Sequence, residues 1–265
     1  MSQNIIEKIQ NNFIERVSFF PKLFSDMQVK ETEKFMYIDC GLSSDTFNVS
    51  VVFADSITKD EIESEIVDYY LEKNYPMALW CWDCLKDANK VIKSTRLTFA
   101  ETNVGMYADT NDFILFDDGQ DDFLIKAISN SEEMKLFGKI LASIFPDDLE
   151  RDNIINYCNK LADASLYLNN SVRLYIGYLN GEAVTTGSAG IFKEHAGIYD
   201  IATIKEKRRL GLGTKMFDFI LRDIKNNFNG ACVLLASEDG YNIYKKAGFK
   251  PACNVHVYEN RHLLK

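Results

Sequence analysis

The spacing of apolar and polar residues divides the first part of the chain into helices and strands. Isoleucines and Phe13 recur at helical spacing, which predicts an amphipathic helix ending before Pro21. Thr58 and Glu61 have the spacing of a capping box, a reciprocal pair of hydrogen bonds that starts a helix. Further elements are expected as strands over 35–40, 47–53, 77–82 and 97–107 and as a helix over 85–93. This part of the chain therefore predicts an α/β domain.

A second series of elements follows a polar break at residues 117–122. Asn180-Gly181 joins two β-prone runs and predicts a tight hairpin, because both turn positions favour positive φ. The expected elements are strands over 123–128, 172–178, 183–192, 196–204 and 231–237, helices over 131–145, 152–168 and 214–228, then a helix and a last strand. We place the domain boundary in the polar break, which gives domains over 1–119 and 120–265.

Composition limits the classes of function. The 265 residues are 46% hydrophobic, which allows a substantial core, and the formal net charge is −9 with a pI near 5.0. An acidic chain is poorly suited to nucleic acid, which binds basic surfaces. No apolar run is long enough to cross a bilayer, and the first residues do not form a signal peptide. We therefore expect a cytoplasmic protein without nucleic-acid or membrane partners.

The cysteines and the acidic break give no metal site. Six scattered cysteines do not form a disulfide framework, and reduced thiols are expected. Cys81 and Cys84 form a CxxC, which could be redox-active or half of a zinc site, but no second ligand pair lies nearby and ordinary strand-end cysteines are favoured. Residues 117–122 lack the alternating ligands and terminal Glu of a calcium loop, so a solvated linker or turn is expected.

The most informative segment is the basic glycine turn over residues 208–214. A β-prone run, 197–204, leads into it and a helical pattern leaves it. Glycines let backbone N–H groups approach a phosphate, and a helix N-terminus adds positive potential at the same point. The alternative to an anion-binding site is a tight turn whose arginines are only solvated. The apolar stripe of Phe217, Ile220, Leu221 and Ile224 favours the anion cradle, because it fixes the helix against the sheet.

The glycine turn, the strand 231–237 and the run from Tyr244 to Phe249 together resemble the acyl-CoA site of the GNAT superfamily of N-acetyltransferases. The resemblance covers about residues 120–265 and matches the order of strand, two helices, three antiparallel strands, helix, strand, helix and strand. It implies an α/β (α+β) fold with a mixed, mainly antiparallel central sheet flanked by helices. For residues 1–119 a degenerate GNAT-like fold without the cradle is one option, with a role on the acceptor side or in dimerisation.

The resemblance implies a binding site for acetyl-CoA, the acyl donor. Arg208, Gly211 and Gly213 match the family's pyrophosphate motif, and the strand before them would pair with the pantetheine arm as it diverges from strand 231–237. Two departures from the family are Lys205, where proline is common, and Ser237, where asparagine is common. The implied cofactor-binding residues are Ile201, Ala202, Thr203, Arg208, Arg209, Leu210, Gly211, Leu212, Gly213, Thr214 and Ser237.

Tyr244 occupies the family's general-acid position, where a phenol can protonate the departing CoA thiolate. A tyrosine that only packs in the core is the alternative. Asp200 is the first candidate for the base that deprotonates the amine, and Glu238 is the second. The three histidines, of which His195 is expected at a turn, form no Ser-His-Asp or Cys-His arrangement.

These residues predict an acetyl-CoA-dependent N-acetyltransferase that transfers the acetyl group directly to a primary amine of a small-molecule or peptide acceptor. The acceptor's identity stays open, and a homodimer is one option for assembly. A non-catalytic acyl-CoA-binding or regulatory module is the alternative. Nucleotide binding at the same turn is less favoured, because no Walker lysine-serine pair and no acidic ribose partner follow.

Overall fold

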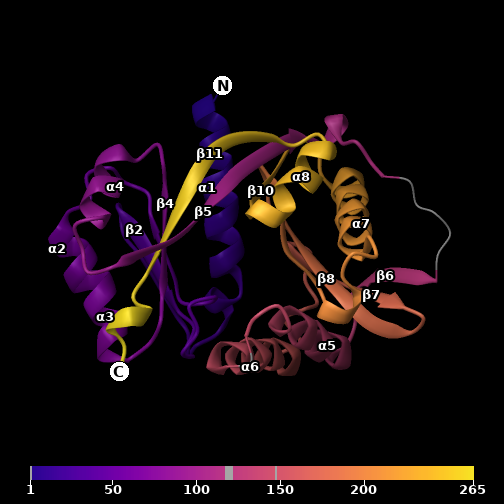
Figure 1. Ribbon diagram of the computed structural model, residues 1–265, viewed down its shortest axis with the longest axis horizontal. Helices are drawn as coiled ribbons and strands as arrows, with labels where there is room; N and C mark the ends of the chain where they lie inside the picture. The colour runs from indigo at the N-terminus through magenta and orange to yellow at the C-terminus, as the bar shows by residue number, and fades with distance from the viewer. Residues whose placement is uncertain (1, 117–121, 147) are drawn as a thin grey trace. The chain divides into compact units, whose positions relative to one another are not determined.

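A computed structural model describes residues 2–116, 122–146 and 148–265, and these group into two compact units (Figure 1). Unit 1 comprises Met1–Arg16 and Met106–Ala252, and unit 2 comprises Val17–Gly105 and Cys253–Lys265. Each unit is therefore built from two separate stretches of the chain. The predicted linker and the boundary at residues 119/120 lie outside the described residues, so the division into 1–119 and 120–265 stays a prediction.

Unit 1 has the element order expected for the second series. Its strands lie in the order β5-β10-β9-β8-β7-β6, with β9 and β10 parallel and β6 through β9 antiparallel. The elements are β6 (Phe123–Ala127), α5 (Ser131–Ala142), α6 (Leu149–Asp163), β7 (Val172–Leu179), β8 (Glu182–Ile191), β9 (Ala196–Thr203), η4 (Lys205–Lys207), α7 (Leu212–Asn227), β10 (Ala231–Ala236), α8 (Glu238–Lys246) and β11 (Lys250–Glu259). They are preceded by α1 (Ser2–Phe19), β5 (Thr98–Asp109) and η3 (Thr110–Asp112), and α1, β5 and β11 each continue into unit 2.

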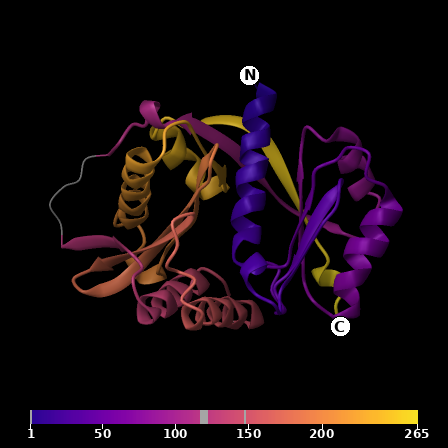
Figure 2. The same ribbon diagram turned by 180° about the vertical axis from the view of Figure 1, so that it is seen from behind.

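Unit 2 contains the strands β1-β2-β3-β4-β11-β5 in spatial order. Strand β4 pairs with β3 in parallel and with β11 in antiparallel orientation, through residues of unit 2. Its remaining elements are η1 (Pro21–Leu23), β1 (Gln28–Glu31), β2 (Phe35–Asp39), β3 (Val49–Val52), α2 (Lys59–Ile62), the π-helical turn η2 (Glu63–Val67), α3 (Asp68–Glu72), β4 (Ala78–Trp82), α4 (Lys86–Ile92) and η5 (Arg261–Leu263). Figure 2 shows α2, α3 and α4 from behind.

The two halves of the chain repeat one order of elements. Strands β7-β8-β9, helix α7, strand β10, helix α8 and strand β11 follow one another in the second half. Strands β1-β2-β3, the α2–α3 helix, strand β4, helix α4 and strand β5 follow one another in the first, again with the third and fourth strands parallel. The first half thus has the element order that the degenerate GNAT-like option implies. No internal repeat in the amino-acid sequence indicates this repeated order of elements.

Helices cover both faces of the unit 1 sheet. The Cβ position of Gly187 on β8 faces Ile220 and Met216 of α7, whereas that of Gly190 faces Arg16 of α1. Because residues an odd number apart on a strand point to opposite faces, α7 and α1 pack on opposite sides. Helix α5 contacts β7, β8 and β9 and packs along α6. The predicted apolar stripe of α7 is buried at Phe217, Ile220, Leu221 and Ile224.

Most predicted elements are confirmed within a few residues. The Thr58–Glu61 capping box forms, and Asn180 and Gly181 both have positive φ, 51° and 81°. Strand β1 was not predicted, because its polar residues are largely exposed and show no apolar alternation. All six cysteines are free thiols, as expected. In the described part of the chain, no helix combines the length and apolar character needed to cross a membrane.

Candidate active site

Strands β9 and β10 separate after a short paired stretch. Their parallel pairing is confined to two positions, Cys232 with Ala196 and Val233 with Gly197. Strand β9 nevertheless continues to Thr203, and β10 continues to Ala236. The carboxyl ends of these two strands therefore flank an opening in the sheet. This is the divergence that the GNAT resemblance implied for the pantetheine arm, and Ile201, Ala202 and Thr203 lie along it.

A β-bulge lies in β9 where the opening begins. Gly187 of β8 faces two residues of β9, Asp200 and Ile201, because the register changes between Thr186–Ala202 and Ser188–Tyr199. Asp200 has a φ of +57°, in the left-handed region that residues other than glycine rarely adopt. Such a conformation costs about 1–3 kcal/mol and must be compensated by surrounding contacts. Bulges bend a strand and increase its twist. The bulge therefore bends β9 away from β10.

Hydrogen bonds hold Asp200 in this conformation. Its Oδ2 accepts hydrogen bonds from Arg16 Nη2 at 2.5 Å and Ser188 Oγ at 2.6 Å, and its backbone carbonyl accepts one from Thr186 Oγ1 at 2.9 Å. Both bonds to the carboxylate end on Oδ2, so Oδ1 has no hydrogen-bond partner among the described residues. The Asp200 side chain is 25% exposed. A carboxylate with one bonded and one open oxygen is therefore present beside the opening.

Helix α1, from the start of the chain, is part of this site. One turn before Arg16, Asn12 donates a hydrogen bond to Gly190 O at 3.2 Å and accepts one from the Tyr199 hydroxyl at 2.5 Å. Its Nδ2 also lies 3.0 Å from Nδ1 of His195, the histidine of the β8–β9 turn. A Cβ on Gly197 would lie 1.9 Å from Asn12 Oδ1, so glycine there lets the helix approach the strand. The same face of α1 thus binds both β8 and β9.

The glycine turn lies where β9 leaves the sheet and α7 begins. Gly211 is the residue before α7 and has a φ of +77°, and Arg209 also has positive φ, +66°. No side chain caps α7, and its first turn contains no acidic residue. The first N–H groups of a helix have no acceptor within the helix. At the start of α7 no capping side chain among the described residues accepts from them either. An anion is the complementary ligand.

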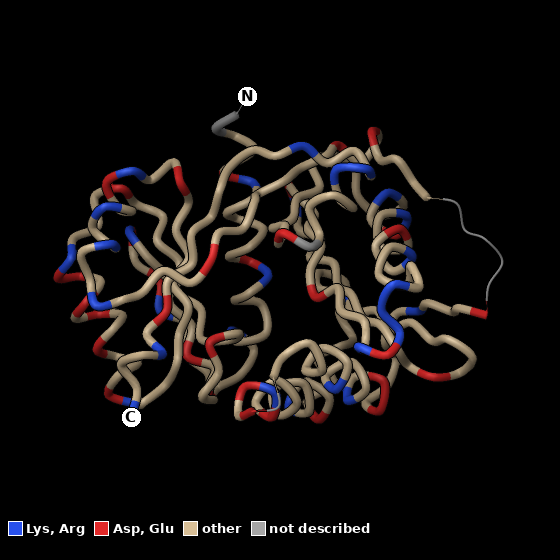
Figure 3. Tube along the Cα trace, viewed as in Figure 1, with Lys and Arg blue, Asp and Glu red and all other residues tan. Residues whose placement is uncertain are grey.

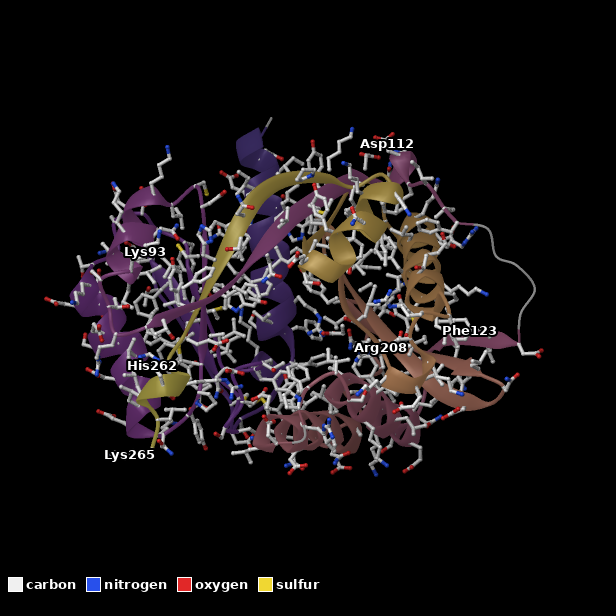
Figure 4. All side chains as sticks on the ribbon, in the orientation of Figure 1. Lys93, Asp112, Phe123, Arg208, His262 and Lys265 are labelled. Carbon is white, nitrogen blue, oxygen red and sulfur yellow. The ribbon has the colours of Figure 1, made fainter. Side chains whose placement is uncertain are left out.

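Basic residues surround this helix end, as Figure 3 shows for the turn before α7. Lys205, Arg208 and Arg209 are exposed, and Lys207 pairs with Glu182 at 3.2 Å. Arg208, labelled in Figure 4, donates from Nε to Thr203 O at 3.1 Å, which ties its guanidinium to the end of β9. Among the described residues, neither Arg208 nor Arg209 pairs with a carboxylate. The cradle's charge is therefore available to a ligand.

Space is also available over the cradle glycines. A Cβ built on Gly211 would meet no atom within 4 Å, and one built on Gly213 would lie 3.6 Å from Thr203 Oγ1, an ordinary contact. Neither glycine is required by packing inside the protein, although positive φ favours glycine at 211. Leu210, Leu212 and Thr214 are the neighbours of these two glycines in the chain. The arrangement fits a pyrophosphate that approaches the backbone closely.

Tyr244 lies on α8, directly after β10. Its ring contacts Phe217 of α7, with centroids 4.9 Å apart, and a Cβ on Gly240 would lie 2.6 Å from its Cε2. Burial raises the pKa of Tyr244 above its ordinary value. Its hydroxyl has no hydrogen-bond partner among the described residues. A protonated phenol with an uncommitted hydroxyl suits a proton donor, and it does not by itself exclude a packing role.

The other predicted residues occupy less defined positions. Ser237 precedes α8, is exposed, and does not cap the helix with its side chain. Glu238, the second candidate base, is exposed at the start of α8. His195 is buried, and burial lowers its pKa. No hydrogen bond among the described residues joins Tyr244 to Asp200 or to Ser237. The roles assigned to these residues therefore stay predictions.

The corresponding place in unit 2 is closed. There β3 and β4 pair at four consecutive positions, from Val49–Ala78 to Val52–Cys81. The helix that follows β3 is capped, because Thr58 and Glu61 satisfy its N-terminal groups and Asp60 and Glu61 add negative charge. This helix end therefore offers an anion fewer unsatisfied N–H groups than the start of α7 does. The third and fourth strands thus separate in the second half of the chain and stay paired in the first half.

Comparisons with known proteins agree with this geometry. Residues 148–263 match the family model described as acetyltransferase (GNAT) domain. A GCN5-related N-acetyltransferase from Kribbella flavida has a TM-score of 0.68 at 11% identity, covering 94% of this chain and 95% of that one. A functionally unknown conserved protein from Staphylococcus epidermidis has a TM-score of 0.63 at 12% identity, covering 91% and 97%. No curated protein matches the chain in sequence.

A third structure resembles the repeated organisation. A tandem GNAT protein from the clavulanic acid biosynthesis pathway has a TM-score of 0.56 at 10% identity and covers 92% of this chain and 87% of that one. The resemblance to the GNAT superfamily is confirmed, because residues 148–263 match the GNAT acetyltransferase family model and the solved structures share the fold. At such low identities the solved structures establish the fold alone.

The residues that hold Asp200 were not predicted from the sequence. Ser188 and Thr186 alternate on β8 and could have been found from their hydroxyls on the face opposite Gly187. Arg16 could not, because it lies 184 residues from Asp200. A basic residue in the last turn of an amphipathic helix has an ordinary explanation in the helix dipole.

Proposed function

We propose that this protein is an acetyl-CoA-dependent N-acetyltransferase that transfers acetyl directly to a primary amine. The observation that carries the proposal is the opening between β9 and β10, which leads to the uncapped, basic N-terminus of α7. A sheet opening suits an extended amide-bearing arm, and the helix end suits a pyrophosphate. Both features belong to residues 148–263, the GNAT domain.

In this proposal the cradle binds the donor. Backbone N–H groups from Arg209 to Thr214 contact the pyrophosphate, and the Arg208 side chain adds charge. The β9 backbone at Ile201, Ala202 and Thr203 pairs with the pantetheine amides. Ser237, with an exposed hydroxyl at the end of β10, provides a further polar contact. Acetyl-CoA supplies an activated acyl group as a thioester.

The amine nitrogen attacks the thioester carbonyl and forms a C–N bond, the C–S bond breaks, and CoA leaves as the thiolate while the acetyl group stays on the amine as an amide. Tyr244 donates its hydroxyl proton to the departing thiolate, because a phenol whose pKa is not lowered is protonated at neutral pH. The amine loses a proton in the same reaction, and Asp200 Oδ1 is the proposed acceptor. The open Oδ1 supports this role, while the bonds from Arg16 and Ser188 fix the other oxygen.

Calorimetric titration with CoA and acetyl-CoA, followed by thiol-release assays with a panel of amines, tests the proposal. We expect CoA to bind and Tyr244→Phe to lower kcat by about 10²-fold with little change in CoA affinity. Absence of CoA binding would refute both an acetyltransferase and a CoA-binding module. Binding without thiol release for any amine would favour the non-catalytic alternative.

A further inference from the structure

The N-terminal helix contributes one charged side chain to the bulge of β9. Arg16 Nη2 donates to Asp200 Oδ2, and the two side chains are 15% and 25% exposed. Arg16 is also close to the Tyr199 ring, with its guanidinium carbon 5.8 Å from the ring centroid. The ion pair thus joins the first helix of the chain to the residue of β9 that has the left-handed conformation.

We propose that Arg16 is a positioning residue for the donor site. Through Asp200 it holds the bulge that keeps β9 apart from β10, and so it sets the opening that receives the pantetheine arm. This inference rests on the proposed function, because it assigns the opening to acetyl-CoA. The two donors to Oδ2 and the Thr186 hydroxyl on the backbone carbonyl act together on one residue.

The position of Arg16 is fixed independently of Asp200. Asn12, four residues earlier on the same face of α1, is fully buried and bonds to Gly190 and to Tyr199. Those contacts hold the helix across β8 and β9 on either side of the bulge. The Arg16 guanidinium therefore has a fixed position, and the Asp200 carboxylate bonds to it only when β9 forms the bulge.

The paired strands of the first half show what happens without such a bulge. β3 faces β2 without a register change over its three paired positions, and it stays paired with β4 at four positions. Asp200 without its hydrogen bonds would favour an extended conformation, since aspartate gains nothing from positive φ alone. Loss of the extra residue from the bulge would reverse the faces of every later residue of β9. Ile201 to Thr203 would then no longer present the same edge to a ligand.

The experiment measures CoA affinity by calorimetry and the KM for acetyl-CoA in matched variants of the full chain. Arg16→Gln should weaken CoA binding about tenfold and raise KM with a smaller change in kcat. Arg16→Lys should restore most of the affinity, because it keeps a cation that can donate to Oδ2. Ser188→Ala, which removes only the second donor, should cause a smaller loss in the same direction.

Arg173→Gln is the matched control. Arg173 Nη1 donates to Asp223 Oδ2 at 2.7 Å, and their side chains are 23% and 27% exposed, so this ion pair of unit 1 has similar burial. It joins β7 to α7 and does not involve the bulge. Arg173→Gln should lower the melting temperature as much as Arg16→Gln does and leave CoA affinity unchanged.

Asp200→Gly separates geometry from charge. Glycine adopts positive φ without strain, so the bulge should persist and CoA affinity should stay within about threefold of wild type. Arg16→Gln should then have no further effect on affinity in the Asp200→Gly background.

Two results would overturn the inference: unchanged CoA affinity in Arg16→Gln, or an equal loss of affinity in Arg173→Gln. With normal wild-type binding, either result leaves the proposed function standing. If the wild-type protein does not bind CoA, both the inference and the proposed function fail.

Discussion

The ring of Tyr244 lies against the backbone of Gly240, so closely that a Cβ at position 240 would be 2.9 Å from the tyrosine hydroxyl oxygen. Gly240→Ala should therefore displace the phenol. If Tyr244 is the general acid, we expect kcat to fall by about 10-fold to 10²-fold while CoA affinity is retained. Steady-state kinetics of thiol release would measure the effect.

Two comparisons make that prediction specific to the hydroxyl. In the Tyr244→Phe background, Gly240→Ala should cause no further loss of kcat, because the proton donor is already absent. Asn242→Ala changes an exposed residue of the same helix and should leave kcat unchanged. If the double variant lost kcat by the sum of the two single-variant effects, Gly240 would affect kcat for a reason other than the position of the Tyr244 hydroxyl.

Burial of Tyr244 predicts a dependence of stability on pH. Its folded pKa is raised above the unfolded value, so its contribution to stability is complete below the unfolded pKa of about 10 and is lost as pH rises toward the folded pKa. Above about pH 10 the wild type should therefore lose melting temperature faster than Tyr244→Phe does. If the difference in melting temperature between the wild type and Tyr244→Phe stayed constant from pH 8 to 11, the phenol would not be buried and neutral.

Gly213 allows stability and ligand binding to be separated. A Cβ there would make only ordinary contacts with Thr203 and Ile201, and alanine favours a helix over glycine by about 1 kcal/mol. Gly213→Ala should therefore leave the melting temperature unchanged or raise it. CoA affinity should also be retained in Gly213→Ala, because the motif that the resemblance implies accepts alanine at this position. Gly213→Asp should instead weaken CoA binding by at least about tenfold, since a carboxylate at the helix N-terminus repels the pyrophosphate. Calorimetry and thermal melting on the same samples would decide, and unchanged CoA affinity in Gly213→Asp would refute the cradle.

The repeated fold raises the question of how many CoA molecules one chain binds. The first half has paired β3 and β4 strands and a helix end occupied by Thr58 and Glu61, whereas the second half has neither. We expect a stoichiometry of one CoA per chain, and Arg208→Gln should weaken that single site. Removing the first-half cap with the double variant Thr58→Ala and Glu61→Ala should not create a second one, because the strands remain paired. Two sites in the titration would mean that the closed half opens.

Local patterns in the sequence were sufficient to predict much of the donor site. The glycine turn, the capping box at Thr58 and the Asn180-Gly181 hairpin each depend on residues a few positions apart, and each takes the expected conformation. The opening between β9 and β10 was expected only through the family resemblance. No spacing of apolar residues distinguishes two strands that separate from two that stay paired.

Long-range contacts account for what the sequence did not reveal. Asp200 was selected as a candidate base from its place on a strand, yet nothing near it in the chain indicates a bulge or positive φ. The partner that stabilises that conformation, Arg16, belongs to a helix whose pattern predicts only that one face is buried. Likewise, the repeat of β1 to β5 in β7 to β11 depends on strand pairing, which dissimilar sequences share.

These long-range contacts predict that the second half is not self-sufficient. Unit 1 includes Met1–Arg16 and Met106–Asp109, and the isolated segment 120–265 lacks both. Without α1, Asn12 no longer fills the space over Gly197 and Arg16 no longer bonds Asp200. We expect the isolated segment to melt at a lower temperature than the full chain and to bind CoA at least about tenfold more weakly. Adding a synthetic peptide of residues 1–20 to the segment 106–265 should restore part of the affinity, whereas the same peptide with Arg16→Gln should restore less. Full CoA affinity in the segment 120–265 alone would show that neither α1 nor β5 is needed to shape the donor site.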